Sequence, residues 1–376
     1  MLFSLLIYSF IAFVMFYGGL LAAIRQKANK NLSFFQLEIL LPLFTFAIIF
    51  GCRYDVGVDH LGYMEDYMAC FNVTKDYEWL FLKIGKIFSL SGVHFSIFFS
   101  FIALLQIFFI FYAFREERFL YPWLSFVLIF GSYYLPFMNI IRQMLAVSIL
   151  VFSIQFIEKR NFLKYFIWIV IAALFHKSSW LYLLLYPIFQ VKDDYFKRQL
   201  PQFLLMIIGF FFYYNSEIIL KAAASAISFF LNFLDYKEYS MRIIENLTAE
   251  RFGRNLGIGI WLRLVQLSII ILYSKKLKEM FPSKHFLIFY NLFVAGFFIE
   301  LLASDMLILT RPFRAFMFVR MIVVSYLLYY LALVSKKLID KYVLVYLVVQ
   351  YIILFLNIIS LEGSNKAQFH FFWQYY

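Results

Sequence analysis

The sequence predicts an all-α integral membrane protein, a polytopic bundle of about 12 transmembrane helices. Hydrophobic residues make up 64% of its 376 positions, and the mean hydropathy is +0.81. A soluble domain of this composition would aggregate. Apolar runs of about 20 residues, the length that crosses roughly 30 Å of hydrocarbon, recur along the chain. We therefore expect residues 1–376 to form a single integral membrane domain.

Twelve apolar segments support this prediction, at residues 2–24, 34–51, 94–114, 119–137, 139–157, 162–176, 179–191, 201–219, 257–274, 285–303, 314–334 and 341–360. Residues 179–191 are short for a span, so 162–191 could instead form a hairpin of broken helices. The stretch Phe81–Leu90 contains Lys83 and Lys86, which predicts an interfacial or re-entrant helix. The loops at 52–93 and 220–256 are expected to form an extracytoplasmic cap.

The basic residues predict how these helices are oriented. In one set of short turns Lys outnumbers Arg by 13 to 5, and short turns rich in basic residues face the cytoplasm. This set comprises Arg25, Lys27, Lys30, Arg115, Arg118, Lys159, Arg160, Lys164, Lys192, Lys197, Arg198, Lys275, Lys276, Lys278, Lys284, Lys336, Lys337 and Lys341. Both termini and the loop at 52–93 then face outward. Because the net charge of +12 includes no contiguous polybasic run, nucleic acid is not an expected partner.

Six arginines lie in or at the predicted outer ends of the helices. They are Arg53, Arg142, Arg263, Arg311, Arg314 and Arg320. A charge at membrane depth is costly and normally faces the protein interior or a water-filled cavity. Arginine also binds phosphate or carboxylate through a planar, bidentate fork. Each arginine alone could snorkel to the interface or pair with an acid, but as a group they predict a pocket for a polyanionic headgroup.

Local spacing supports the pocket at two places. Arg311 and Arg314 are three residues apart at the start of a helix that follows a proline, where the helix dipole also attracts anions. Asn139, Arg142 and Gln143 share one helix face because they are spaced i, i+3 and i+4. Polar stripes of this kind also hold membrane helices together, and that is the alternative role for Gln143.

The candidate acid–base residues are His176, Asp59 and Glu300. His176 lies at the predicted outer break between two short helices, and broken membrane helices often line cavities. A structural, hydrogen-bonded histidine is the alternative. Asp59 lies on the outer loop, and Glu300 lies within the tenth segment, where it could simply pair with an arginine. The five histidines show no metal-ligand spacing, so no metal and no cofactor are expected.

Three motifs in the first half of the chain occur in a recognisable order. They are Arg53-Tyr-Asp-Val-Gly-Val-Asp59 followed by Tyr63, then Asn139-Ile-Ile-Arg142-Gln143, then Phe175-His176-Lys-Ser-Ser179. Together they resemble the EpsG family, which is similar to Wzy-type polysaccharide polymerases of bacterial envelopes. The resemblance implies a GT-C-like helical fold in the bacterial cytoplasmic membrane. It also implies undecaprenyl-diphosphate-linked glycans as donor and acceptor, used at the extracytoplasmic side.

These implied substrates give the candidate residues roles in polymerising lipid-linked oligosaccharide repeats. Arg142, Arg311 and Arg314 would stabilise the diphosphate leaving group, and Arg53 would help bind the acceptor. His176, Asp59 or Glu300 would be the base that deprotonates the acceptor hydroxyl. The remaining predicted binding residues are Arg263, Arg320, Asn139 and Gln143. Expected partners are membrane lipids, a flippase and chain-length regulator proteins.

Two other functions fit the same composition. A flippase for lipid-linked oligosaccharides would also have about twelve helices and interior arginines. It should show a two-lobed repeat and charge in both halves of its cavity, whereas the unexplained charge here lies at the outer side. A ligase that transfers O-antigen-type glycan to another acceptor would look nearly the same in sequence.

The predicted orientation can be tested with alkaline phosphatase fusions. A fusion after Asp66 should be active because this loop is predicted to face outward, and a fusion after Lys276 should be inactive. The reverse pattern of activity would overturn both the orientation and the predicted side of the site.

Overall fold

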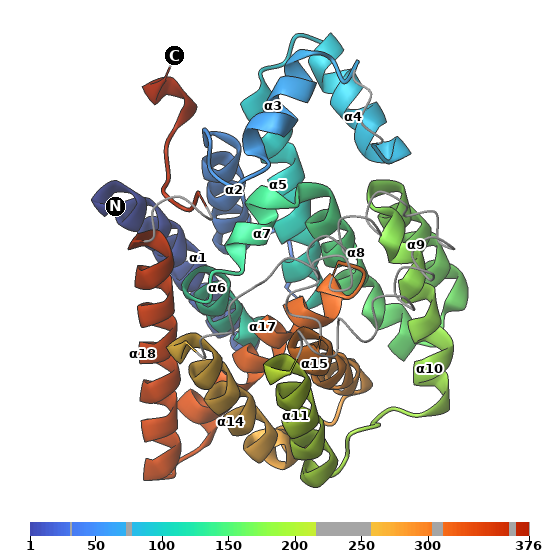
Figure 1. Ribbon diagram of the computed structural model, residues 1–376, viewed down its shortest axis with the longest axis vertical. Coiled ribbons are helices and arrows are strands. Elements are labelled where there is room, and N and C mark those ends of the chain that lie inside the picture. The colour runs from blue at the N-terminus through green and yellow to red at the C-terminus, as the bar shows by residue number, and fades with distance from the viewer. Residues whose placement is uncertain (31, 73–76, 216–256, 303–310, 361–365, 376) are drawn as a thin grey trace. The chain divides into compact units, whose positions relative to one another are not determined.

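A computed structural model describes residues 1–30, 32–72, 77–215, 257–302, 311–360 and 366–375, and within these it is helical, with no strand (Figure 1). Seven helices are long and apolar enough to cross a membrane. They are α1 (Leu2–Ala28), α5 (Phe95–Ala113), α8 (Ile141–Glu158), α14 (Ile258–Met280), α15 (Lys284–Leu302), α17 with η3 (Arg314–Val334) and α18 (Leu338–Ser360). These helices confirm the all-α class.

Shorter helices complete the described chain. Four are apolar: α2 (Leu37–Gly51), η1 with α6 (Arg118–Phe130), α9 (Phe162–Phe175) and α11 (Gln199–Tyr214). Residues 177–191 form the 3-10 helix η2 (Lys177–Leu184) and α10 (Leu185–Val191), as expected for a broken hairpin. The interfacial or re-entrant candidate is α4 (Trp79–Leu90). The count of about 12 spans, the GT-C-like fold and the membrane position of α4 stay predictions, and residues 220–256 lie outside the described residues.

One predicted segment differs from the structure. Residues 119–137 do not form a single helix but α6 (Tyr121–Phe130) and α7 (Tyr134–Asn139), separated by a turn. Ser132 in this turn has φ of +57°, a left-handed conformation that a continuous right-handed helix cannot contain. Hydropathy misses this break because the flanking residues are all apolar.

The described helices divide into two compact units. Unit 1 comprises residues 1–193, 283–288 and 321–376, and unit 2 comprises residues 194–282 and 289–320. The boundary falls inside α15 and α17, so both helices contribute to each unit. Each unit is described by itself below, and the single membrane domain expected from the sequence stays a prediction.

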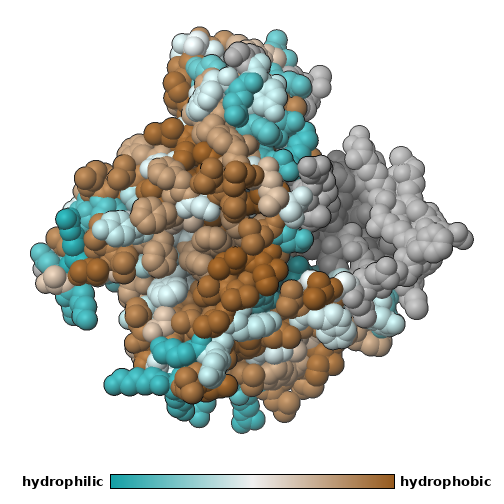
Figure 2. Space-filling view, turned by 90° about the vertical axis from the view of Figure 1, so that its left-hand side faces the viewer, coloured by the Kyte–Doolittle hydropathy of each residue, from teal (hydrophilic) through white to brown (hydrophobic). Residues whose placement is uncertain are grey.

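Large apolar side chains are exposed along the helices. On α1, Leu6 and Phe13 are 60% and 67% exposed, and on α18 Tyr342 and Ile353 are also exposed. Apolar side chains cover much of the face drawn in Figure 2. Surfaces of this kind are unfavourable in water but are the expected contact with lipid acyl chains. They support the prediction of a membrane protein.

The helices of unit 1 bring its charged residues to two opposite ends. At one end Arg25 pairs with Glu38 at 2.9 Å, so the last residues of α1 lie beside the first residues of α2. A Cβ built on Gly51 would lie 2.5 Å from the carbonyl oxygen of Ser96, so α2 ends close against the start of α5. The residues that follow Gly51 therefore lie at the end of unit 1 opposite Arg25.

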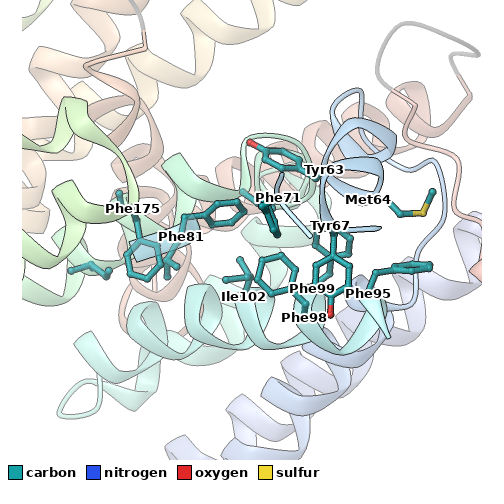
Figure 3. Packing of buried hydrophobic residues seen from close by; sticks show 14 of the residues in the cluster. Tyr63, Met64, Tyr67, Phe71, Phe81, Phe95, Phe98, Phe99, Ile102 and Phe175 are labelled. Carbon is teal, nitrogen blue, oxygen red and sulfur yellow. The ribbon is translucent and has the colours of Figure 1, made fainter. Parts of the chain in front are cut away.

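An aromatic cluster fixes two short helices to that second end. α3 (His60–Met68) and α4 contribute Tyr67 and Phe81, which pack with Phe98 of α5 (Figure 3). The ring centroids of Phe81 and Phe98 are 5.7 Å apart. A Cβ on Gly85 would lie 2.3 Å from the ring of Phe71, so the absence of a side chain there allows the close packing of α4. This packing positions the residue that precedes α4, Glu78.

The arginine of the first motif is a buried structural residue. Arg53 is 2% exposed, and its guanidinium donates hydrogen bonds to three backbone carbonyls: those of Phe50, Val56 (3.2 Å) and Met138 (2.9 Å). It therefore connects the end of α2, the following loop and α7. Gly57 in that loop has φ of +88° and lies against the Met138 carbonyl, a conformation that favours glycine.

The C-terminal segment, residues 366–375, is hydrogen-bonded to the same loop. The Tyr54 amide donates to the His370 carbonyl at 2.8 Å, and the Gly57 amide donates to the Lys366 carbonyl at 3.0 Å. Lys366 also pairs with Asp55 at 2.6 Å. We call residues 366–375 the C-terminal strap.

Replacing Arg53 by Met should lower the stability of the protein. Three carbonyls would lose their donor, at a cost of about 1–3 kcal/mol each when buried. We expect a loss of roughly 3 kcal/mol or more, measured as a lower thermal unfolding midpoint in detergent. Asp55→Asn is the matched control, because it breaks only a half-exposed ion pair worth about 0–1 kcal/mol and asparagine tolerates the φ of +49° at that position. Equal midpoints for the two variants would contradict the structural role of Arg53.

Candidate functional site

A carboxylate that the sequence analysis did not select joins two of the predicted site residues. Glu78 accepts a hydrogen bond from Nη1 of Arg142 through Oε2. Its other oxygen, Oε1, lies 3.1 Å from Nδ1 of His176 and accepts the backbone N–H of Lys177, also at 3.1 Å. Glu78, Arg142 and His176 therefore form one charged group in unit 1, which we call the Glu78 site.

Each member of the Glu78 site lies at a helix end. Glu78 precedes α4 and has an extended backbone. Arg142 is in the first turn of α8, directly after the bend at Ile140 that ends α7. His176 ends α9, and its extended backbone turns the chain into η2. Residues far apart in sequence thus meet because three helices begin or end at the same place.

The surroundings of Glu78 keep its carboxylate charged. Burial by itself would raise the pKa of Glu78. The contacts with His176 and Arg142 outweigh burial and lower this pKa to about 2. Glu78 is therefore an anion at neutral pH, and it neutralises one positive charge in the site.

The Arg142 guanidinium is held between aromatic rings. It lies 4.7 Å from the ring centre of Tyr77 and 5.8 Å from that of Phe81, and its Nε is 3.4 Å from the Tyr63 hydroxyl. Its Nη2 makes no hydrogen bond with the residues that the structure describes. The side chains of Arg142 and His176 are 22% and 21% exposed, so a ligand can reach both of them.

The first motif contacts the second beside this site. The Asp59 amide donates to Oδ1 of Asn139 at 2.9 Å. Asp59 itself is exposed, whereas Gln143 is buried. His60 is buried beside them and accepts the Asp55 amide through Nδ1 at 3.2 Å. Burial and the charges of Arg53 and Lys366 lower the pKa of His60 to about 2, so this histidine is neutral.

The other predicted acid lies in unit 2 and pairs with two arginines. Glu300 on α15 is 3.2 Å from Arg263 of α14 and 2.9 Å from Arg320 of α17. A Cβ on Gly296 would lie 2.3 Å from the carbonyl oxygen of Phe316, so glycine allows α15 and α17 to approach closely. The alternative that Glu300 pairs with an arginine is confirmed.

The six predicted arginines therefore fall into different surroundings. Arg53 and Arg142 belong to unit 1, and Arg263, Arg311, Arg314 and Arg320 belong to unit 2. Arg314 is half-buried, and Arg311 is exposed. Convergence of all six on one pocket stays a prediction. In the described part of the chain, no three His, Cys, Asp or Glu side chains gather as a metal site would require.

Comparison of the sequence with models of known protein families agrees with the ordered motifs and the helical fold. A model of the EpsG family, proteins that resemble Wzy-type polysaccharide polymerases, matches residues 36–375. The chain belongs to the EpsG family. No curated protein and no solved structure matches the chain significantly.

Membership of the EpsG family confirms the resemblance that the three motifs gave. The matched region contains the Glu78 site and every residue predicted to bind substrate or catalyse its reaction. Glu78 was missed because it lies outside the three motifs, in a loop without a distinctive pattern. A carboxylate immediately before an amphipathic helix was the one sequence signal that could have indicated it.

Substituting Glu78 by Gln should remove a pH-dependent part of the stability. Because the pKa of Glu78 is lowered from 4.5 to about 2, its charge stabilises the fold above pH 4.5, by on the order of 3 kcal/mol. This contribution should be lost as the pH falls from about 4.5 to about 2. The unfolding midpoints of wild type and Glu78→Gln should therefore converge over that interval. Glu65→Gln, at an exposed position on α3, should match wild type throughout; a constant gap between wild type and Glu78→Gln would contradict the charged pair.

Proposed function

We propose that this EpsG-family protein polymerises undecaprenyl-diphosphate-linked oligosaccharide repeat units at the outer face of the bacterial cytoplasmic membrane. Family membership supports a polysaccharide polymerase in a membrane. The observation that carries the proposal is the Glu78 site, in which an imidazole and a guanidinium share one carboxylate. A glycosyl transfer from a lipid diphosphate needs both groups.

The proposed reaction joins two glycans and releases a lipid diphosphate. A hydroxyl of the acceptor attacks the anomeric carbon of the donor, and the bond between that carbon and the diphosphate oxygen breaks. The hydroxyl must lose its proton, and the leaving diphosphate must be stabilised as negative charge develops on it. The protein therefore has to supply a base and a cation.

His176 is the proposed base. Its Nδ1 lies 3.1 Å from Oε1 of Glu78 without hydrogen-bond geometry, and this nearby negative charge favours the tautomer with a proton on Nδ1. Nε2 then has a free lone pair and makes no hydrogen bond with the described residues. A carboxylate that orients a histidine also stabilises the imidazolium formed when the ring accepts a proton. In this arrangement Glu78 is a positioning residue, and Nε2 takes the hydroxyl proton.

The other two acids fit the role of base less well. The carboxylate oxygens of Glu300 are already engaged in ion pairs with two arginines. Asp59 is exposed, so water competes for its oxygens. Arg53 directs its guanidinium to backbone carbonyls, and we assign it to holding the loop rather than to the acceptor.

Arg142 is the proposed cation of unit 1. Nη1 contacts Glu78, while Nη2 remains for a phosphate oxygen of the donor. In unit 2, Arg263 and Arg320 form ion pairs with Glu300. Arginines can thus provide the charge stabilisation that the leaving group requires.

The Glu78 site also bears on the two alternative functions, a flippase and a ligase. A flippase moves its substrate without breaking a bond and needs no oriented base. The contact of Glu78 with His176 therefore favours a transferase. A ligase uses the same chemistry with another acceptor, and only the products distinguish it from a polymerase.

Substituting His176 by Asn should abolish chain extension. Asn keeps a hydrogen-bond donor near Glu78 but cannot take up a proton. In cells lacking the chromosomal gene, a plasmid copy of His176→Asn should give surface glycan collapsed to one repeat, a loss of polymer of at least about a hundredfold. Polymer is measured as the electrophoretic ladder of surface glycan.

The control is His94→Asn, because His94 caps α5 and Asn is an equally good cap. This variant should restore the full ladder, and immunoblots of membranes should show equal amounts of both variants. A normal ladder from His176→Asn would exclude this histidine as the base. In the gene deletion itself, loss of all transferred glycan would indicate a ligase, and repeats retained inside the cell would indicate a flippase.

A further inference from the structure

A basic cavity lies at the end of unit 1 opposite the Glu78 site. Its volume is about 280 Å³, and its lining includes Gln26, Lys30, Phe34, Arg115, Glu116 and Arg118. Arg115 follows α5 and contacts Gln155 near the end of α8 at 2.9 Å, whereas Arg142 begins α8. Thirteen residues of helix, about 20 Å, separate these two positions on α8. The cavity is therefore separate from the proposed reaction site.

The most buried charge of this cavity has no carboxylate partner among the residues that the structure describes. Arg118 is 2% exposed, and its guanidinium donates to the carbonyls of Leu32 (2.7 Å), Ser33 (3.0 Å) and Arg115 (3.2 Å). Its remaining contact is the amide oxygen of Gln36 at 3.5 Å. Carbonyl dipoles satisfy N–H groups but leave the full positive charge uncompensated. A buried charge without a counter-charge is unfavourable, so this cavity attracts an anion.

The other lining residues strengthen that attraction. Lys30 and Arg115 add two positive charges, and the one lining carboxylate, Glu116, is an exposed side chain 3.6 Å from Arg115. A guanidinium has five N–H donors, and Arg115 uses Nη1 for the Tyr112 carbonyl and Nη2 for Gln155. Arg115 and Lys30 therefore still have donors available. An anion with several oxygens, such as a phosphate group, matches this set of donors.

Apolar residues beside the cavity indicate where the rest of the ligand lies. Phe35 and Leu37, which follow the lining residue Phe34, are 63% and 73% exposed. In a membrane protein these side chains contact acyl chains. A phosphate with acyl chains attached would place its charge in the cavity and its chains on this apolar surface.

We propose that this cavity binds the phosphate headgroup of an anionic membrane phospholipid. A cavity of about 280 Å³ is at the lower limit for small-molecule sites, which suits a headgroup rather than a nucleotide. Its position fits the predicted orientation, because Arg25, Lys27 and Lys30 belong to the turns expected to face the cytoplasm. Basic pockets between helices on that side bind anionic headgroups.

The test measures lipid binding by the purified full-length protein in detergent. Its thermal unfolding midpoint is followed while dioleoylphosphatidylglycerol is added, with dioleoylphosphatidylcholine as the zwitterionic lipid of matched chains. The anionic lipid should raise the midpoint saturably, because it binds the folded state, and the zwitterionic lipid should not. Lys30→Glu should weaken the apparent affinity for the anionic lipid about tenfold.

Lys27→Glu is the matched control, because Lys27 is equally exposed on the same chain segment but does not line the cavity. It should change the affinity less than about twofold. Equal responses to the two lipids, or equal losses in the two variants, would overturn the site. Inorganic phosphate is added separately. If it reproduces the shift and removes the response to the lipid, the occupant is a soluble phosphate, and the lipid assignment is overturned.

Discussion

One buried guanidinium, that of Arg53, holds together the parts of unit 1 on which the Glu78 site depends. It bonds to carbonyls at the end of α2, in the following loop and at the end of α7. The last of these belongs to Met138, which lies four residues before Arg142. The start of α8 is thereby fixed relative to α2, and the C-terminal strap is hydrogen-bonded to the same loop. Removing this charge would leave three buried carbonyls without their donor, so the loop and the start of α8 would lose a shared hydrogen-bond partner.

Because the Glu78 site lies at helix ends, its residues also provide partners for backbone groups that an interrupted membrane helix leaves unpaired. An interrupted helix leaves backbone N–H and C=O groups without partners, and these are tolerated only inside the protein or in a cavity. After α9 ends at His176, the freed N–H of Lys177 donates to Glu78, the same carboxylate that contacts the His176 ring. The break in the helix therefore supplies the imidazole and one of the donors that keep Glu78 charged. The proposed base and a hydrogen-bond partner for the freed backbone N–H group therefore come from the same local geometry.

Hydropathy and local spacing predicted most of the helices and selected two members of the Glu78 site. The other features depend on contacts between residues that are distant in sequence. The apolar segments identified the helices, because a lipid-facing helix needs little more than length and apolarity. They missed the break at Ser132, where backbone conformation rather than hydropathy ends α6. Motifs identified Arg142 and His176 but not Glu78, which is 64 and 98 residues away from them and joins them only in the fold. Likewise the charge of Arg53 was visible in the sequence, whereas its three carbonyl partners were not.

The Glu78 site also suggests how donor binding and proton transfer could be linked in the proposed reaction. Within unit 1, Glu78 pairs with Arg142, so these two opposite charges compensate each other. A phosphate that does reach Arg142 competes with Glu78 for the guanidinium. The carboxylate would then interact more strongly with the His176 ring as the donor arrives, which would couple donor binding to the proposed proton transfer.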